Sequence, residues 1–169
     1  SNQLAWACRI APEKGIEDAI AAVQQLAIPL KIFGAMPDQD YWHTICQRYP
    51  KAPITYEGFL STDDLQKALG QCQGLIMTPK WIEAFGNVAI EALACGVPVI
   101  SYRRGGPSEI IDHGKTGWLV EPDDVEGLVA SIGQLEQIQR QDCRHQAEQN
   151  YSLRAMGDRV EQWLKDILA

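Results

Sequence analysis

The chain alternates short apolar segments with longer amphipathic ones, and this alternation constrains its fold more than any other feature. Between the apolar segments, residues such as Ile16, Ile20 and Val23 recur with the spacing of a helix. Short strands separated by helices predict a parallel sheet covered on both faces. We therefore predict one doubly wound α/β domain. Its strands, bounded by Gly, Pro or Ser, are expected at Leu4–Arg9, Leu30–Gly34, Ile54–Phe59, Gly74–Thr78 and Val97–Tyr102.

The rest of the chain gives local signals of the same kind. Asp38 and Ser61 are placed to cap the helices that follow them. The sequence predicts a loop at Arg103–Pro107, a turn at Gly114–Gly117 and a short strand at Trp118–Val120. Three helical patterns close the chain. The first is an apolar stripe over residues 125–135. The second, Arg140–Asn150, is polar nearly all round and is expected to be an exposed or bridging helix, and the third is a closing helix over residues 153–168.

Composition excludes several functional classes. The chain has 15 Lys and Arg against 22 Asp and Glu, a net charge of −7, which argues against a nucleic-acid-binding surface. No segment approaches the roughly 20 apolar residues that span a bilayer. Its five cysteines are widely spaced and form no CxxC pair. We expect reduced thiols, no zinc site and a cytoplasmic location.

The segment 81–100 carries the strongest candidate site. A helix is predicted from about Ala84 to Cys95, where Gly96 ends it. A helix N-terminus that follows a parallel strand presents unpartnered backbone N–H groups to an anion. A glycine there lets a phosphate approach the backbone closely. The residues at this helix mouth are Phe85, Gly86, Asn87 and Val88.

Two glutamates, Glu83 and Glu91, flank the helix mouth. Eight helical residues rise about 12 Å, beyond the roughly 5 to 9.5 Å of a glycosidase carboxylate pair. The spacing instead suits one carboxylate on sugar hydroxyls and one on ribose, with a diphosphate between them. Alternatively, both are solvated helix glutamates. Glu91 interrupts an otherwise apolar helix, where an unpartnered carboxylate is costly.

The segment Arg9–Gly15 follows the first strand and precedes the first helix. In a doubly wound sheet it lies at the same edge as the Glu83 loop. Arg9 and Lys14 could therefore supply two cations to a diphosphate leaving group. Alternatively, they form surface ion pairs with Glu13 or Glu17.

Together these segments resemble the C-terminal, donor-binding half of the retaining glycosyltransferases of family 4, which have the two-domain GT-B fold. The resemblance covers nearly the whole chain and implies a Rossmann-like domain over residues 1–169. The Glu-x7-Glu spacing is weakly specific alone, but the combination of motifs in this order is strongly specific. The motifs are Arg9–Gly15, Glu83–Glu91, Ala94–Ile100, Gly105–Ile111 and Gly114–Val120.

The resemblance implies a role for each matching residue. Arg9 and Lys14 would contact the diphosphate and stabilise its developing charge, and Glu83 would hold donor-sugar hydroxyls. Glu91 would bind the ribose. The amides of Phe85, Gly86 and Asn87 would assist Glu83, Asn87 and Val88 would reach the phosphate, and the base would lie beside Gly58, Phe59 and Leu60. These enzymes generally need no metal, and no cofactor is expected.

The resemblance also implies what this chain lacks. The family has an N-terminal domain of similar size that carries most of the acceptor site, and no part of this sequence corresponds to it. We expect the chain alone to bind nucleotide without transferring sugar. The full-length enzyme would transfer a sugar from a nucleoside diphosphate to a sugar, lipid or small-molecule acceptor. Peripheral association of that enzyme with a membrane is compatible with this expectation.

Two alternatives and several details stay open. The chain could belong to a GT-B sugar-nucleotide epimerase or phosphorylase, or it could be a non-enzymatic nucleotide-binding module. The base, sugar, acceptor and oligomeric state are not determined by the sequence. Cys8 stands where the family usually has glycine, and Arg103 and Arg104 follow a strand toward the same edge. Whether Asn87 or either arginine contacts the donor is also open.

Overall fold

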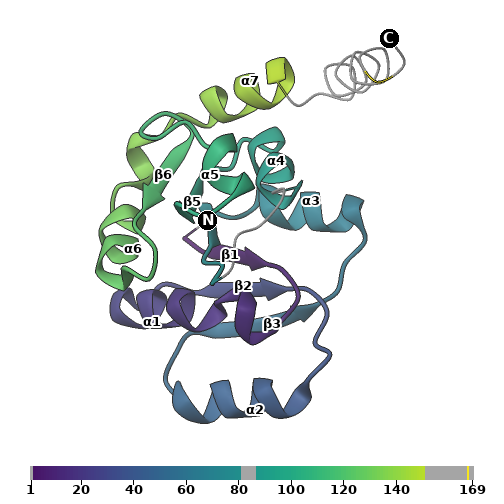
Figure 1. Ribbon diagram of the computed structural model, residues 1–169, viewed down its shortest axis with the longest axis vertical. Helices are drawn as coiled ribbons and strands as arrows, with labels where there is room; N and C mark the ends of the chain where they lie inside the picture. Colours follow the sequence, from purple (N-terminus) through teal and green to yellow (C-terminus); the bar gives the residue numbers. More distant parts are fainter. Residues whose placement is uncertain (1, 81–86, 151–166, 168–169) are drawn as a thin grey trace.

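The computed structural model describes residues 2–80, 87–150 and 167 and contains a six-stranded, fully parallel sheet. The strand order is β3-β2-β1-β4-β5-β6, with β3 at one edge and β6 at the other (Figure 1). This confirms the predicted doubly wound α/β fold, including the short strand near Trp118. The strands are β1 Leu4–Ala7, β2 Leu30–Phe33, β3 Ile54–Gly58, β4 Gly74–Met77, β5 Val99–Tyr102 and β6 Gly117–Val120.

Helices cover both faces of the sheet, and each face has its own apolar core. The first core receives side chains from α1 Ile16–Leu26, α2 Gln39–Arg48 and α6 Val125–Ile132. The second receives them from α3 Thr62–Gly70, α4 Asn87–Ala94, α5 Gly106–Ile110 and α7 Arg140–Asn150. The 3₁₀ turns are η1 Pro12–Lys14 and η2 Leu135–Gln137.

The strand sequences explain these two cores. Successive side chains of a strand point to opposite faces. In β1, Leu4 and Trp6 enter the first core, whereas Ala5 enters the second. Both faces are buried, so the strand is apolar throughout instead of alternating with polar residues.

Local capping follows the sequence signals. The side chain of Asp38 accepts a hydrogen bond from the Tyr41 amide at 3.1 Å. Ser61 accepts one from the Asp64 amide at 3.3 Å. Each bond satisfies one N–H that has no partner inside its helix, and so each fixes a helix start.

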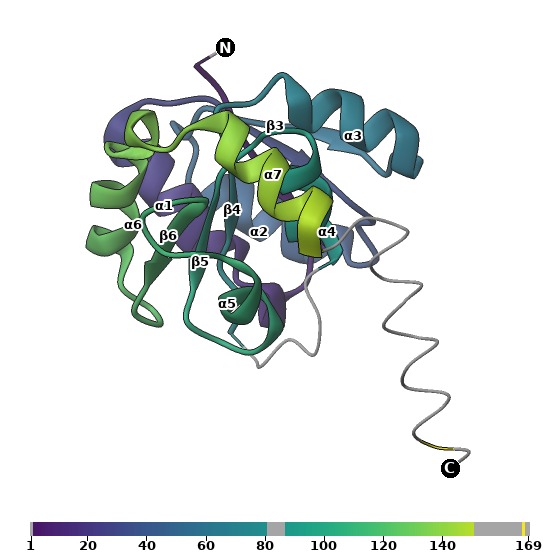
Figure 2. The same cartoon turned by 90° about the horizontal axis from the view of Figure 1, so that it is seen from above.

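Two local predictions need correction, and one lies outside the described residues. The predicted loop at Arg103–Pro107 is shorter, because Gly106 and Pro107 begin α5. Pro is favourable in a first helical turn, where its missing N–H is not needed. The polar helix that was expected to be exposed or bridging is α7, and it instead packs on α4 (Figure 2) and buries Cys143 and Ala147. The closing helix at 153–168 falls outside the described part of the chain.

The order of the sheet determines where a ligand can bind. β1 lies between β2 and β4, so the connections that leave β1 and β4 run to opposite faces. This topological switch point opens a crevice at the carboxyl ends of the two strands. None of the helices in the described ranges is long and apolar enough to cross a bilayer.

Candidate functional site

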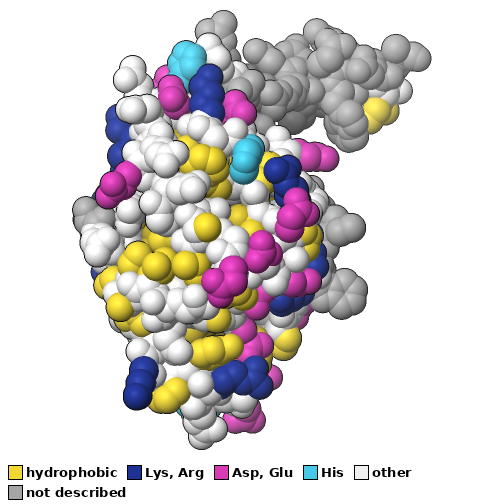
Figure 3. Space-filling model, turned by 90° about the vertical axis from the view of Figure 1, so that its left-hand side faces the viewer, with side chains coloured by type: hydrophobic (Ala, Val, Ile, Leu, Met, Phe, Trp, Pro, Cys, Tyr) yellow, Lys and Arg dark blue, Asp and Glu magenta, His cyan; other side chains and the backbone are white. Residues whose placement is uncertain are grey.

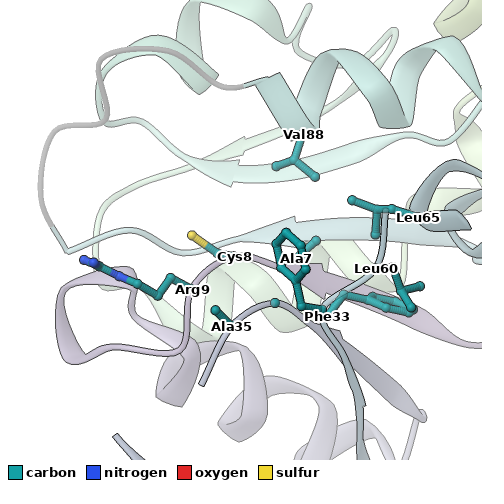
Figure 4. Close-up of a pocket in the computed structure, with 10 residues that line it drawn as sticks. Ala7, Cys8, Arg9, Phe33, Ala35, Leu60, Leu65 and Val88 are labelled. Atoms are coloured by element: carbon teal, nitrogen blue, oxygen red, sulfur yellow. The ribbon is translucent and has the colours of Figure 1, made fainter. Parts of the chain in front are cut away.

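A pocket of about 210 Å³ lies at the carboxyl ends of β1, β2 and β3 and reaches the start of α4 (Figure 4). Val88 projects into it from α4, and Leu65 approaches from α3. Most of the lining is apolar, and among the described residues that form it Arg9 alone is charged. A small pocket with an apolar wall and a cation at its mouth suits a flat, anionic ligand. The lining residues are Ala7, Cys8, Arg9, Phe33, Gly34, Ala35, Phe59, Leu60, Leu65 and Val88.

The loop between β1 and α1 is held firmly against the end of β4. Thr78 is buried, and its hydroxyl donates to the carbonyl of Gly15 at 2.6 Å while accepting from the indole N–H of Trp6 at 3.4 Å. The Lys80 amide donates to the Glu13 carbonyl at 2.9 Å. The Arg9–Lys14 loop therefore lies beside the segment after β4, as predicted, for the part of that segment that the structure describes, which ends at Lys80.

The two predicted cations lie in this loop. The Arg9 guanidinium forms an ion pair with Glu13 at 2.7 Å, and the Arg9 side chain is 55% exposed. The surface ion pair with Glu13, one of the alternatives for Arg9, is thus present. A backbone hydrogen bond and the nearby charge of Arg9 hold the pKa of Glu13 below its ordinary value. Lys14 is half-exposed at the end of η1.

The predicted base-binding turn, Gly58 to Leu60, lies at the opposite side of the pocket from Arg9. The Gly34 amide donates to the Gly58 carbonyl at 3.0 Å, which links the ends of β2 and β3. Phe59 and Leu60 line the pocket, and Phe59 is 78% exposed, the most exposed large apolar side chain described. An exposed aromatic ring beside an apolar pocket is a stacking surface for a planar group.

The helix-mouth residues are only partly described. In the described part of the chain α4 begins at Asn87, and Val88 lines the pocket. The predictions for Glu83, Phe85 and Gly86 lie outside the described residues. Glu91 is three positions beyond Val88, on neighbouring turns of the same side of the helix. Its carboxylate is half-buried and makes no hydrogen bond or ion pair with another described residue.

We expect Glu91→Gln to stabilise the folded chain at neutral pH. Burial raises the pKa of Glu91 above its ordinary value of 4.5, so the folded chain binds that proton more tightly than the unfolded chain. The stability of the native protein must then fall as the pH rises through and above 4.5, and the amide removes this loss. Thermal melts should show a Tm about 2 °C higher for the variant at pH 7 and equal Tm values below pH 4. A higher native Tm at pH 7 would contradict the assigned burial.

The sequence did not predict the charged groups that surround Lys80. The Lys80 ammonium donates to Asp18 at 2.6 Å and to Asp123 at 2.9 Å. Arg104 forms a bidentate pair with Asp123 at 2.8 and 3.2 Å, and Arg103 pairs with Glu121 at 3.2 Å. The two arginines therefore bind carboxylates of the loop after β6. The only sequence signal for these two arginines was that they follow the end of a predicted strand.

The surface agrees with the acidic composition. In the face shown in Figure 3, acidic side chains are interspersed with basic and apolar ones, and the described residues form no continuous basic surface there. A nucleic-acid-binding face would need such clustered cations.

Comparisons with known proteins point to one family. Residues 1–153 match the family model described as Glycosyl transferases group 1. Glycogen synthase of Mycobacterium tuberculosis is 32% identical over 136 residues, which cover 77% of this chain and 33% of that protein. Sulfoquinovosyl transferase of Arabidopsis thaliana is 32% identical over 127 residues, covering 73% of this chain and 24% of that protein. The chain therefore spans about a third or less of these relatives.

Solved structures share the fold over nearly the whole chain. Anabaena HepE in complex with UDP-glucose superposes with a TM-score of 0.85 at 24% identity, covering 98% of this chain and 49% of HepE. Sucrose-phosphate synthase from Thermosynechococcus elongatus superposes with a TM-score of 0.87 at 23% identity, covering 99% of this chain and 46% of the synthase.

Proposed function

The chain belongs to the family of glycosyl transferases group 1, and on that basis we propose that it is the donor-binding domain of a retaining, family 4 glycosyltransferase of the GT-B type. The observation that carries the proposal is the pocket at the carboxyl ends of β1, β2 and β3, beside the switch point of the sheet, with Arg9 at its mouth and Val88 of α4 in its lining. In α/β sheets of this kind, ligands bind in the crevice outside the carboxyl ends of the strands.

The donor is proposed to lie across the crevice. Its base occupies the apolar pocket and stacks near Phe59 and Leu60. Its diphosphate lies between Arg9 and Lys14 on one side and the amides at the start of α4, Asn87 and Val88, on the other. The positive end of the helix dipole favours an anion there.

The remaining roles are proposed from the family resemblance. Glu91 accepts hydrogen bonds from the ribose hydroxyls. Its position one turn beyond Val88 is consistent with a ribose bound next to a diphosphate at the start of α4. Glu83, with Phe85 and Gly86, holds the donor sugar. These three residues lie outside the described ranges, so the proposal for them rests on the sequence motif alone.

Sugar transfer is proposed to need no metal ion. The leaving diphosphate gains negative charge as the bond to the sugar breaks, and this charge has to be stabilised. Arg9, Lys14 and the N-terminus of α4 offer that stabilisation without a divalent ion.

The proposal divides the reaction between two domains. The chain spans about half of the structural neighbours and a third or less of the curated relatives it matches. We propose that the acceptor, whether sugar, lipid or small molecule, binds to a separate N-terminal domain. The 169-residue chain alone then binds the donor nucleotide without transferring sugar.

Calorimetric titration of the chain with UDP, GDP and ADP tests this proposal. UDP is the first choice because the HepE structure holds a UDP-sugar. We expect selective binding of one nucleotide, weakened about tenfold in Glu91→Ala, since a hydrogen bond to a charged group contributes about 1.5 kcal/mol. Binding of none of the three by the folded chain would contradict the proposal.

The matched control is Glu136→Ala, which removes one carboxylate at the opposite end of the sheet. Glu136 is an exposed residue of η2. The preceding residue, Leu135, packs against Gly74 at the start of β4. This variant should bind the nucleotide as the native chain does. Equal weakening in both glutamate variants would mean that Glu91 acts only through net charge.

A further inference from the structure

At the same edge of the sheet as the pocket, a network of charged side chains joins four connections between strands and helices. Lys80, after β4, donates to Asp18 of α1 and to Asp123 of the loop after β6. Arg104, after β5, binds Asp123 with two hydrogen bonds and donates to the Pro79 carbonyl at 2.8 Å. The functional roles proposed above use none of the four charged residues of this network, Lys80, Asp18, Asp123 and Arg104.

Two further contacts make this network rigid. The hydroxyl of Tyr102 donates to Asp18 at 2.6 Å, and burial together with that bond raises the pKa of Tyr102 well above its ordinary value. The Lys80 ammonium and the Arg104 guanidinium lie 6.0 and 5.9 Å from the centre of the Tyr102 ring, within the range of cation–π attraction. The two cations therefore lie close to one buried aromatic ring.

The electrostatics of the network are satisfied internally. Burial opposes the charge on Lys80, but its hydrogen bonds to Asp18 and Asp123 outweigh that effect and raise its pKa. The bonds from Arg104 and Lys80 lower the pKa of Asp123. Asp123 also has φ of 66°, a left-handed conformation that is strained for most residues and tolerated by Asp and Asn. In this conformation the Asp123 carboxylate accepts hydrogen bonds from both cations.

The network contacts the loop that carries Lys14 on both sides of that residue. The Lys80 backbone N–H donates to Glu13, immediately before Lys14, and the Lys80 side chain binds Asp18, four residues after it. Thr78 holds Gly15 between these two points. Movement of Lys80 would therefore displace the turn in which Lys14 lies.

We propose that Lys80 and Asp123, with Arg104, are positioning residues that fix the Lys14 turn for binding of the donor diphosphate. This inference rests on the proposed function, because it is from there that Lys14 takes its role. Lys80 and Arg104 do not contact the donor in this arrangement. They fix the geometry of the loop, and the precision of that geometry determines how well its cation meets a phosphate oxygen.

The variant Asp123→Asn separates positioning from simple electrostatics. Asparagine tolerates the same backbone conformation, so the substitution removes mainly the negative charge. If Asp123 acted on the diphosphate through space, losing a negative charge would strengthen UDP binding. If it positions the loop, UDP binding weakens about five- to tenfold, while uridine binding stays within twofold of the native value.

Glu121→Gln is the matched control. Glu121 follows the same strand, pairs with the exposed Arg103 and lies outside the network, and its substitution changes the charge equally. We expect UDP affinity within twofold of native in this variant. Lys80→Met should weaken UDP binding as Asp123→Asn does, and Lys80→Arg should restore most of it. Tightening in Asp123→Asn, or no difference from Glu121→Gln, overturns the proposal.

Amide hydrogen exchange gives a readout that does not depend on any ligand. Lys14 N–H donates to Ala11 and Gly15 N–H to Pro12, so both amides report the integrity of the turn. Their exchange should accelerate about tenfold in Asp123→Asn and in Lys80→Met, and remain native in Glu121→Gln. If the native chain binds no nucleotide but this acceleration occurs, the proposed function fails while the loop-fixing network stands. Unchanged exchange in both variants overturns the network.

Discussion

Gly15→Ala is expected to lose roughly 3 kcal/mol or more of folding free energy. Gly15 has φ of 72°, and a Cβ atom there would lie 1.8 Å from the Thr78 carbonyl oxygen and 3.0 Å from its carbon. The obstructing atoms are backbone at the end of a buried strand, so they cannot rotate away. The left-handed conformation adds about 1 kcal/mol for any residue with a Cβ. Thermal unfolding should therefore occur roughly 6–12 °C lower than in the native chain.

Gly58→Ala is the matched control for this prediction. Gly58 also has a positive φ, 90°, but apart from its chain neighbours no described residue has a heavy atom within 4 Å of the position its Cβ would take. Its substitution should cost only the conformational strain, about 1–2 kcal/mol. The difference between the two variants isolates the close approach of the β1–α1 loop to β4. Equal losses would show that the approach is looser than the structure describes.

Removing Arg9 and Lys14 together should reduce the affinity for a nucleoside diphosphate about 100-fold or more. A hydrogen bond between charged groups contributes about 1.5–3 kcal/mol, and partial exposure of these side chains lowers the value for each. Two such contacts still exceed the roughly 2.7 kcal/mol that a 100-fold change requires. The variant also leaves Glu13 without its ion-pair partner, and a free carboxylate beside the site repels the ligand further.

Titration calorimetry at two salt concentrations measures this effect. Lys51→Ala/Lys67→Ala serves as the control, since it removes the same charge from two exposed lysines outside the loop. The control should bind as the native chain does at 150 mM salt, where charges beyond about 8 Å are largely screened. A comparable loss in both double variants would assign the effect to net charge and reject a diphosphate contact by Arg9 and Lys14.

The fold could be predicted from the sequence because its signals are local and repeated. Apolar runs of strand length, such as the one that became β1, alternate with helical patterns throughout. Asp38 and Ser61 mark helix starts by bonds that span three residues. The prediction was wrong where a helix is too short to give a periodic signal, as in α5 at Gly106, and where a few buried residues interrupt a polar pattern, as in α7.

Less of the candidate site than of the fold could be predicted from the sequence. The loop with Arg9 and Lys14 could be assigned to the edge of the crevice because sheet topology alone brings it there. The pairing of Arg9 with Glu13 remained one of two alternatives, since the choice depends on side-chain geometry. The roles of Glu83, Glu91 and their neighbours stay predictions.

The sequence by itself determined the class of fold, the strand edge at which the Arg9–Lys14 loop lies and the motifs that place this chain in its family. Only the tertiary structure decided that Lys80 joins Asp18 to Asp123, and that Gly15 lies against Thr78. The physical reason is sequence separation. Periodicity and capping act over a few residues, whereas these contacts join groups 43 to 63 positions apart, whose meeting depends on how the helices pack on the sheet.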